Sequence, residues 1–242
     1  MALLGLVGVS LQHMLQVSGQ VRADAGAAAF LASTAPAFIV LFGALFLREK
    51  LRGWQITGVL LATVGAGVVS SGGDIEFILN GHFGSSGSLL VLLSSVAWAA
   101  VSILHRDFVK GRPPALLAAG MMTFGWLFLL PLFVAQAGWQ EFSRLSVTGW
   151  GAVGLTGVLS TAVAYLLYAH ALKLADASRL AAIQTIEPII AIIAAGLVLA
   201  EAVTLPLAVG GVAILSGVYL AERHTAVWAV RSNASKTPLK GV

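Results

Sequence analysis

Residues 175–201 read ADASRLAAIQTIEPIIAIIAAGLVLAE, and residues 23–49 read ADAGAAAFLASTAPAFIVLFGALFLRE. The two stretches share their first three residues, the position of one proline and their last glutamate. They lie 152 positions apart, and the same offset pairs Gly58 with Gly210 without a gap. Apolar composition alone would not place Asp, Pro and Glu at one common offset. The sequence therefore predicts a duplicated helical unit.

The composition indicates a membrane protein. Of the 242 residues, 58% are hydrophobic and 10% are charged, whereas a soluble domain has about 25% charged residues. The absence of cysteine excludes disulfides and thiolate metal sites. No catalytic motif and no cluster of metal ligands occurs, so neither an enzyme nor a cofactor is expected. The net charge is +4, and the basic residues lie in short clusters between the apolar runs and in the C-terminal tail. This distribution argues against a nucleic-acid-binding face.

Apolar runs recur at lengths that can cross a bilayer, which takes about 20 residues. In lipid, every backbone N–H and C=O group must be hydrogen-bonded within the protein, so these runs are expected to be helices. The predicted fold is an all-α integral membrane protein with eight transmembrane helices, at about 2–21, 26–47, 54–71, 87–105, 115–136, 148–172, 179–200 and 204–221.

The distribution of lysine and arginine predicts the orientation. Basic clusters at 48–52, at 106–112 and after 222 are expected in the cytoplasm, whereas 72–86 has no Lys or Arg and is expected outside. The C-terminus is then cytoplasmic. Counting crossings puts Glu49 inside and Glu201 outside, so the two units are expected to be inverted. Inverted repeats around a site near mid-membrane are typical of secondary transporters.

Four segments follow from this reading. We expect a first repeat of three helices (1–71), an outer loop (72–86), a second repeat of five helices (87–221) and a basic cytoplasmic tail (222–242). The first repeat is two helices shorter than the second.

A family likeness rests on Pro36 with the run to Leu47-Arg48-Glu49, on Glu187-Pro188 with the run to Glu201, and on GSLLVLLSSVAWAAVSILHR (87–106). The chain resembles the EamA-type permeases of the drug/metabolite transporter superfamily up to about Ala221, apparently without their first two helices. The resemblance implies a ten-helix, five-plus-five inverted architecture in the inner membrane. It also implies movement of small metabolites, often amino acids or drugs, usually driven by an ion gradient.

Glu187 and Pro188 interrupt an apolar helix, and a charge at mid-membrane costs about 2.5–3.5 kcal/mol on insertion scales. Pro188 removes one backbone hydrogen bond and frees the carbonyl near residue 184. Glu187, with Gln184 on the same helix face, is thus a candidate for binding substrate or a coupling proton. The alternative is a structural glutamate at a helix kink, where Pro36 marks the corresponding kink in the first unit.

Polar residues also recur on two helices related by the offset. Tyr165 pairs with His13 and Tyr168 with Gln16, as a cavity between the repeats would require. The alternative is that they hydrogen-bond neighbouring helices. Trp98 is a further candidate for the cavity wall, with packing as its alternative role.

Two pairs of acidic residues flank these helices. Asp24 and Asp176 precede helices and are expected to cap them. Glu49 and Glu201 end helices, and their recurrence predicts a bond to a neighbouring helix or loop.

We therefore expect a secondary transporter, most simply an exporter, of small metabolites such as amino acids or drug-like compounds across the inner (plasma) membrane by alternating access. Its expected partners are a small-molecule substrate and the lipid bilayer, with protons as coupling ion and a homodimer as further expectations. The alternative function is a truncated, non-transporting membrane remnant or a helix-pairing interaction protein.

Overall fold

The computed structural model describes residues 1–74, 84–108, 114–163, 167 and 186–222. These residues form helices and connecting turns, without a β-strand among them, which confirms the all-α membrane fold. The helices are α1 (Ala2–Gly5), η1 (Leu6–Leu11), α2 (Gln12–Gln20), α3 (Ala25–Ala32), α4 (Ala35–Leu47), α5 (Gly53–Ser71), α7 (Ser86–Phe108), α8 (Pro114–Ala135), η2 (Gly138–Ser143), α9 (Val147–Gly154), η3 (Leu155–Val163), α12 (Glu187–Val198) and α13 (Leu205–Glu222).

Several helical runs are long and apolar enough to cross a bilayer. Among the described residues these are Ala2–Gln20, Ala25–Leu47, Gly53–Ser71, Ser86–Leu104 and Leu205–Glu222. Shorter apolar helices cover Ala119–Ala135, Val147–Leu159 and Glu187–Val198. Where both ends are described, these bounds agree closely with the spans expected from the sequence.

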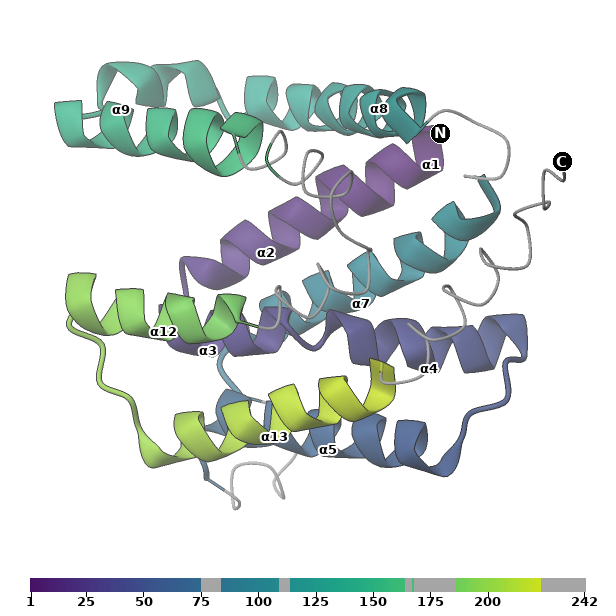
Figure 1. Cartoon of the computed structure of the whole chain (residues 1–242). Helices are drawn as coiled ribbons and strands as arrows, with labels where there is room; N and C mark the ends of the chain where they lie inside the picture. The colour runs from purple at the N-terminus through teal and green to yellow at the C-terminus, as the bar shows by residue number, and fades with distance from the viewer. Residues whose placement is uncertain (75–83, 109–113, 164–166, 168–185, 223–242) are drawn as a thin grey trace, which may run out of the picture.

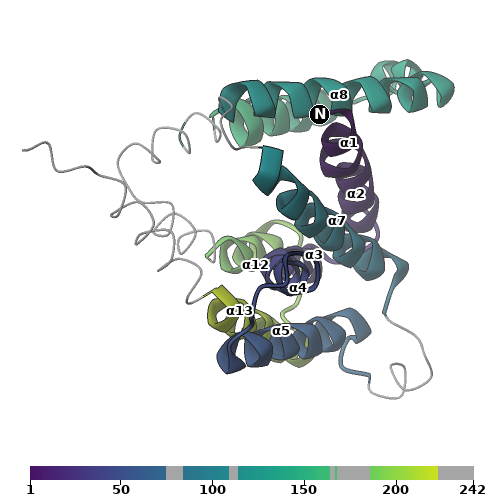
Figure 2. The same ribbon diagram turned by 90° about the vertical axis from the view of Figure 1, so that its right-hand side faces the viewer.

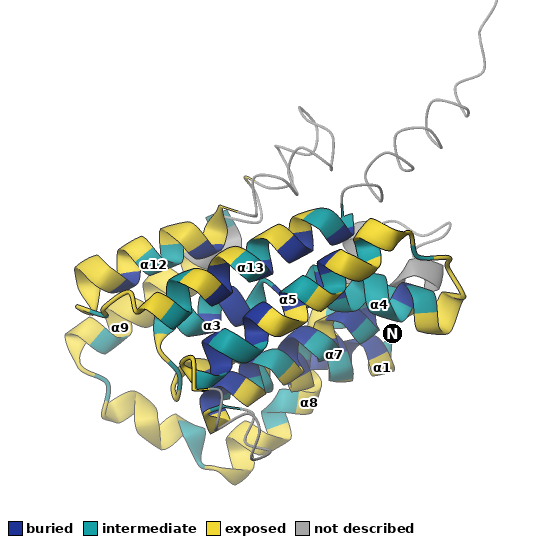
Figure 3. Cartoon of the chain, turned by 90° about the horizontal axis from the view of Figure 1, so that it is seen from below, coloured by how far each residue is buried: buried dark blue, intermediate teal, exposed yellow. Residues whose placement is uncertain are grey.

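Many large apolar side chains are exposed on the outside of the molecule. Figure 3 shows exposed residues along α9, α12 and α13. Leu197 is 83% exposed and Leu205 is 76% exposed. Water would penalise such a surface, whereas lipid tails solvate it without cost. The chain is therefore a multi-pass membrane protein.

The helices stack in layers (Figures 1 and 2). α8 and α9 form one edge, α1 and α2 lie beside α7, and α12 lies with α3 and α4 above the pair α5 and α13. The buried core joins α3, α4, α5, α7 and α13 through mostly small side chains. Small side chains let helices approach closely, which is the usual source of helix association in membranes.

The run from Ala25 to Leu47 is one span broken in the middle. α3 ends at Ala32, and α4 begins at Ala35 with Pro36 in its first turn. In the break, the Ser33 hydroxyl donates to the Phe30 carbonyl at 2.7 Å, and the Thr34 hydroxyl donates to the Leu31 carbonyl at 2.6 Å. These bonds satisfy carbonyls that a helix end leaves without an intrahelical partner.

The ends of α4 and α12 have the same backbone geometry. Arg48 and Ala200, 152 positions apart, are both left-handed, with φ of 54° and 55°. The next N–H, of Glu49 or of Glu201, donates at 3.3 Å to a carbonyl six residues back in its helix. Left-handed residues are a common helix stop, and here one stop occurs twice at the predicted offset.

α13 packs most extensively against α5, and the two run antiparallel. A Cβ on Gly58 would lie 2.6 Å from the Gly217 carbonyl oxygen, and a Cβ on Gly65 would lie 2.6 Å from that of Gly210. Only glycine allows this approach. Gly210 lies 152 positions after Gly58, and Gly217 lies 152 positions after Gly65. The offset therefore relates the residues of one close contact to those of the other.

Candidate functional site

A cavity of about 910 Å³ lies inside the helical layers. Its walls come from α2, α3, α4, α7, α12 and α13, so it joins the α2–α7 layer to the α12–α13 side of the molecule. Small-molecule sites occupy about 300–1,000 Å³, and this cavity falls within that range.

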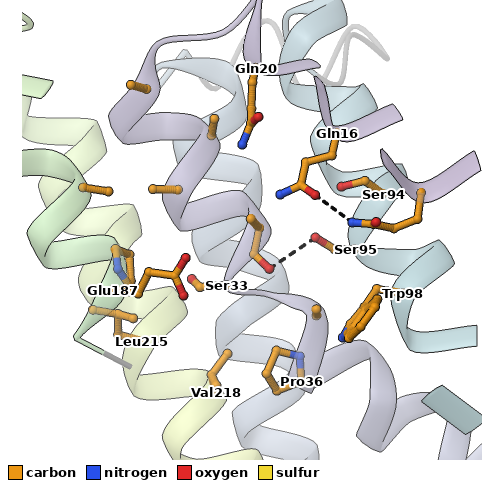
Figure 4. Close-up of a pocket in the computed structure, with 18 of the residues that line it drawn as sticks. Gln16, Gln20, Ser33, Pro36, Ser94, Ser95, Trp98, Glu187, Leu215 and Val218 are labelled. Atoms are coloured by element: carbon orange, nitrogen blue, oxygen red, sulfur yellow. Dashed lines mark hydrogen bonds between the residues drawn. The ribbon is translucent and has the colours of Figure 1, made fainter. Parts of the chain in front are cut away.

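Three glutamines follow one stripe of α2 at four-residue spacing. Gln12, Gln16 and Gln20 all line the cavity, and Figure 4 shows Gln16 and Gln20 on the same wall. The Gln12 amide nitrogen donates to the Gln16 side-chain oxygen at 2.8 Å. His13 is exposed on the same helix and also lines the cavity. The stripe directly follows the π-helical turn η1, a distortion often found at functional sites.

Gln12 differs from its neighbours because it is only 8% exposed. Its nitrogen is bonded to Gln16, but its side-chain oxygen has no hydrogen-bond partner within the described part of the chain. Buried acceptors normally accept a hydrogen bond, and this oxygen lacks such a donor.

The α7 wall supplies two buried serines and a tryptophan. Ser95 donates to the carbonyls of Leu31 and Ala32 at 3.2 and 3.4 Å. Pro36 has no N–H, so the Ala32 carbonyl lacks its usual helical donor, and Ser95 replaces it. Trp98 is 45% exposed and lines the cavity (Figure 4).

Glu187 occupies the opposite wall, facing Ser33 in Figure 4. Glu187 is the first residue of α12, with Pro188 in the first turn. The part of the expected span 179–200 that precedes Ile186 lies outside the described residues. The positive end of the helix dipole favours a carboxylate at this position. The equivalent residue in the first unit is Ala35, which also lines the cavity.

Six of the candidate residues meet at this cavity: Glu187, His13, Gln16, Trp98, Pro36 and Pro188. Three others, Gln184, Tyr165 and Tyr168, lie outside the described residues. The sequence missed six polar lining residues, namely Gln12, Gln20, Ser33, Ser94, Ser95 and Glu222. The four-residue spacing of the glutamines was a usable signal for the first two. Nothing in the sequence marked the serines, because small hydroxyl residues are also common at helix–helix contacts.

The start of α3 is capped from the other end of the chain. The Glu201 carboxylate accepts hydrogen bonds from the N–H groups of Ala25 and Gly26 at 3.0 and 3.3 Å. The expected capping by Asp24 is wrong, because its side chain makes no capping bond. Glu201 does bond a neighbouring helix, as its recurrence predicted.

Comparison with known proteins decides the family. The model of the EamA-like transporter family matches residues 1–71 and 85–223. The chain belongs to the EamA-like transporter family. This EamA-like chain is therefore a membrane transporter.

Curated relatives agree with this assignment. The EamA-like chain is 32% identical over 227 residues to a "Probable terminal-alkyne amino-acid exporter" of Streptantibioticus cattleyicolor, a match covering 93% of this chain and 73% of the relative. It is 28% identical to an "Uncharacterized transporter" of Archaeoglobus fulgidus, covering 91% of this chain and 76% of the relative. A "Probable amino-acid metabolite efflux pump" of Escherichia coli is 25% identical, over 81% of this chain and 67% of its own.

A solved crystal structure resembles the EamA-like chain with a TM-score of 0.50 and 21% sequence identity. The match covers 90% of this chain and 72% of the other. At this identity the likeness concerns the fold alone.

Proposed function

We propose that this chain exports small metabolites, such as amino acids or drug-like compounds, across the plasma membrane by alternating access. The observation that carries the proposal is the cavity of about 910 Å³, which joins helices of both units and presents a carboxylate, amides and an indole. Convergent polar groups in an otherwise apolar pocket are typical of small-molecule sites. Two curated relatives carry the words exporter and efflux pump in their names.

Alternating access by rocking needs two similar units of opposite orientation. The antiparallel glycine contact between α5 and α13 supports such a pair, because the offset of 152 exchanges Gly58–Gly217 with Gly210–Gly65. A contact that maps onto itself in this way is what a two-fold axis perpendicular to the helices produces.

Contacts between loops support the proposed orientation. A Cβ on Gly73 would contact Pro206, and a Cβ on Gly87 would contact the Arg22 backbone. Together with the cap of Glu201 on Ala25, these contacts gather at one end the loops that the sequence assigns to the outside. At the opposite end, the Gln55 side chain donates to the Ala221 carbonyl at 3.4 Å, near the proposed cytoplasmic tail.

Glu187 is the proposed coupling or binding group, and Glu187→Gln tests it. The variant keeps the size of the side chain and removes its charge. We expect gradient-driven transport of a radiolabelled amino acid or drug in sealed proteoliposomes to fall at least about tenfold, while the protein still inserts. Glu141→Gln is the matched control, because Glu141 is 64% exposed and pairs only with Arg144 among the described residues.

Two outcomes would count against the proposal. Unchanged uptake and efflux by Glu187→Gln would remove Glu187 from the mechanism. A correctly inserted wild-type chain that moves none of a panel of amino acids and drugs would favour the helix-pairing alternative. Repeating the assay with and without a pH gradient tests protons as the coupling ion, and cross-linking in the membrane tests the homodimer.

A further inference from the structure

We propose that the cavity binds its substrate through an ammonium group and favours amines over compounds that carry a carboxylate. The inference rests on the proposed function, because it names the substrate class of the same cavity. It goes beyond that function in excluding acids and in ranking zwitterionic amino acids below simple amines.

The first observation is the unpartnered oxygen of Gln12. Its amide nitrogen donates to Gln16 at 2.8 Å, so the polar atom left unbonded on this lining residue is an acceptor. The side chain is only 8% exposed, and an acceptor so deeply buried needs a donor. A substrate N–H supplies that donor, and a charged N–H makes the stronger hydrogen bond.

The second observation is the charge of the described wall. Glu187 and Glu222 both line the cavity, whereas no lysine or arginine does so along its described residues. His13 is the remaining titratable group on this part of the wall. The positive end of the α12 dipole is already compensated by Glu187 in its own first turn. A carboxylate on the substrate would therefore face two other carboxyl groups on this part of the wall.

The third observation is the indole of Trp98. Its ring lines the cavity from α7, the helix that packs against the glutamine stripe of α2. Indole is the best aromatic partner for an ammonium group. Trp98 thus offers the cation a second favourable surface in the same cavity (Figure 4).

A matched series of probes tests the proposal on the full chain in lipid nanodiscs. The probes are 2-phenylethylamine, phenylalanine, 3-phenylpropanoate and 2-phenylethanol, and calorimetry gives each Kd. We expect the amine to bind at least about tenfold more tightly than each of the other three. Equal or tighter binding of phenylalanine or phenylpropanoate would overturn the proposal.

Variants of Gln12 separate recognition from packing. Gln12→Met keeps the volume without the acceptor, and we expect it to weaken amine binding about tenfold. Gln12→Glu adds a negative charge at the same place, so we expect tighter amine binding and weaker phenylpropanoate binding. Gln140→Met is the control, because Gln140 is exposed in η2 and does not line the cavity, so we expect a small change. Equal losses for all probes in both Gln12 variants would reduce Gln12 to a packing role and overturn the inference.

The transport assay keeps this inference apart from the proposed function. Selective amine binding without transport of any probe would contradict the proposed transport and leave the amine preference in place. Transport of acids and amines at equal rates would sink the amine preference alone.

Discussion

α4 and α12 end alike and begin differently. Both stop at a left-handed residue followed by a glutamate whose N–H reaches back into the helix. Both have proline in the first turn, yet α12 begins with Glu187 where α4 begins with Ala35. The two helices thus share the backbone geometry of their ends, whereas the charge facing the cavity occurs in α12 only.

The difference separates two requirements on the same chain. Proline and the left-handed stop set where a helix begins and ends, which each copy needs in order to pack. A carboxylate in an apolar wall is costly, and both carboxylates of the described wall, Glu187 and Glu222, belong to the second half of the chain. The shared features are therefore expected to govern stability, and the unshared ones to govern transport.

The largest effect is expected from breaking the shared glycine contact. Gly65→Ala would put a methyl group 2.6 Å from the Gly210 carbonyl oxygen, which forces α5 and α13 apart. We expect a loss of about 1–3 kcal/mol, typical of overpacking, seen as a lower melting temperature and less monodisperse protein in size-exclusion chromatography.

Gly67→Ala is the control for this prediction. Gly67 lies in the same helix, but a Cβ there has nothing within 4 Å. Equal stability of the two variants would show that the contact does not hold α5 against α13. Gly217→Ala should behave like Gly65→Ala, since the offset relates these positions.

A smaller effect is expected from the cap between the units. Glu201→Gln keeps one acceptor oxygen for the N–H groups of Ala25 and Gly26 but loses the charge that favours the start of α3. We expect a loss of about 1 kcal/mol, the usual range for a helix cap, measured as thermal stability in nanodiscs. Glu141→Gln, at an exposed ion pair, should change stability little. Similar melting temperatures for the two variants would contradict the cap.

The smallest effect is expected from Ser95→Ala. It removes the hydroxyl that bonds the carbonyls of Leu31 and Ala32 beside the proline break. We expect a loss of about 0.5 kcal/mol, the low end for one hydrogen bond, read from the same thermal assay. Ser102→Ala is the control, because Ser102 bonds only the Trp98 carbonyl of its own helix among the described residues. A larger loss in the control would show that the break in α3–α4 does not depend on Ser95.

Much of the cavity could be found from the sequence because it depends on rare residues in apolar surroundings. Glu187, His13, Gln16 and Trp98 stand out there, and the structure places all four on one cavity. The buried acceptor of Gln12 could not be found this way. Its role depends on which of its two polar atoms Gln16 occupies, and that is a matter of side-chain geometry.

The sequence by itself determined the membrane class and the helical spans whose two ends the structure describes, because these follow from local hydropathy. It also predicted the offset of 152 from the identity between two stretches. Tertiary structure alone decided that Glu201 rather than Asp24 caps α3, and that Ser95 bonds the carbonyl freed by Pro36. Each of these joins groups far apart in the chain. Such pairings depend on how the helices pack in three dimensions, which local sequence patterns do not determine.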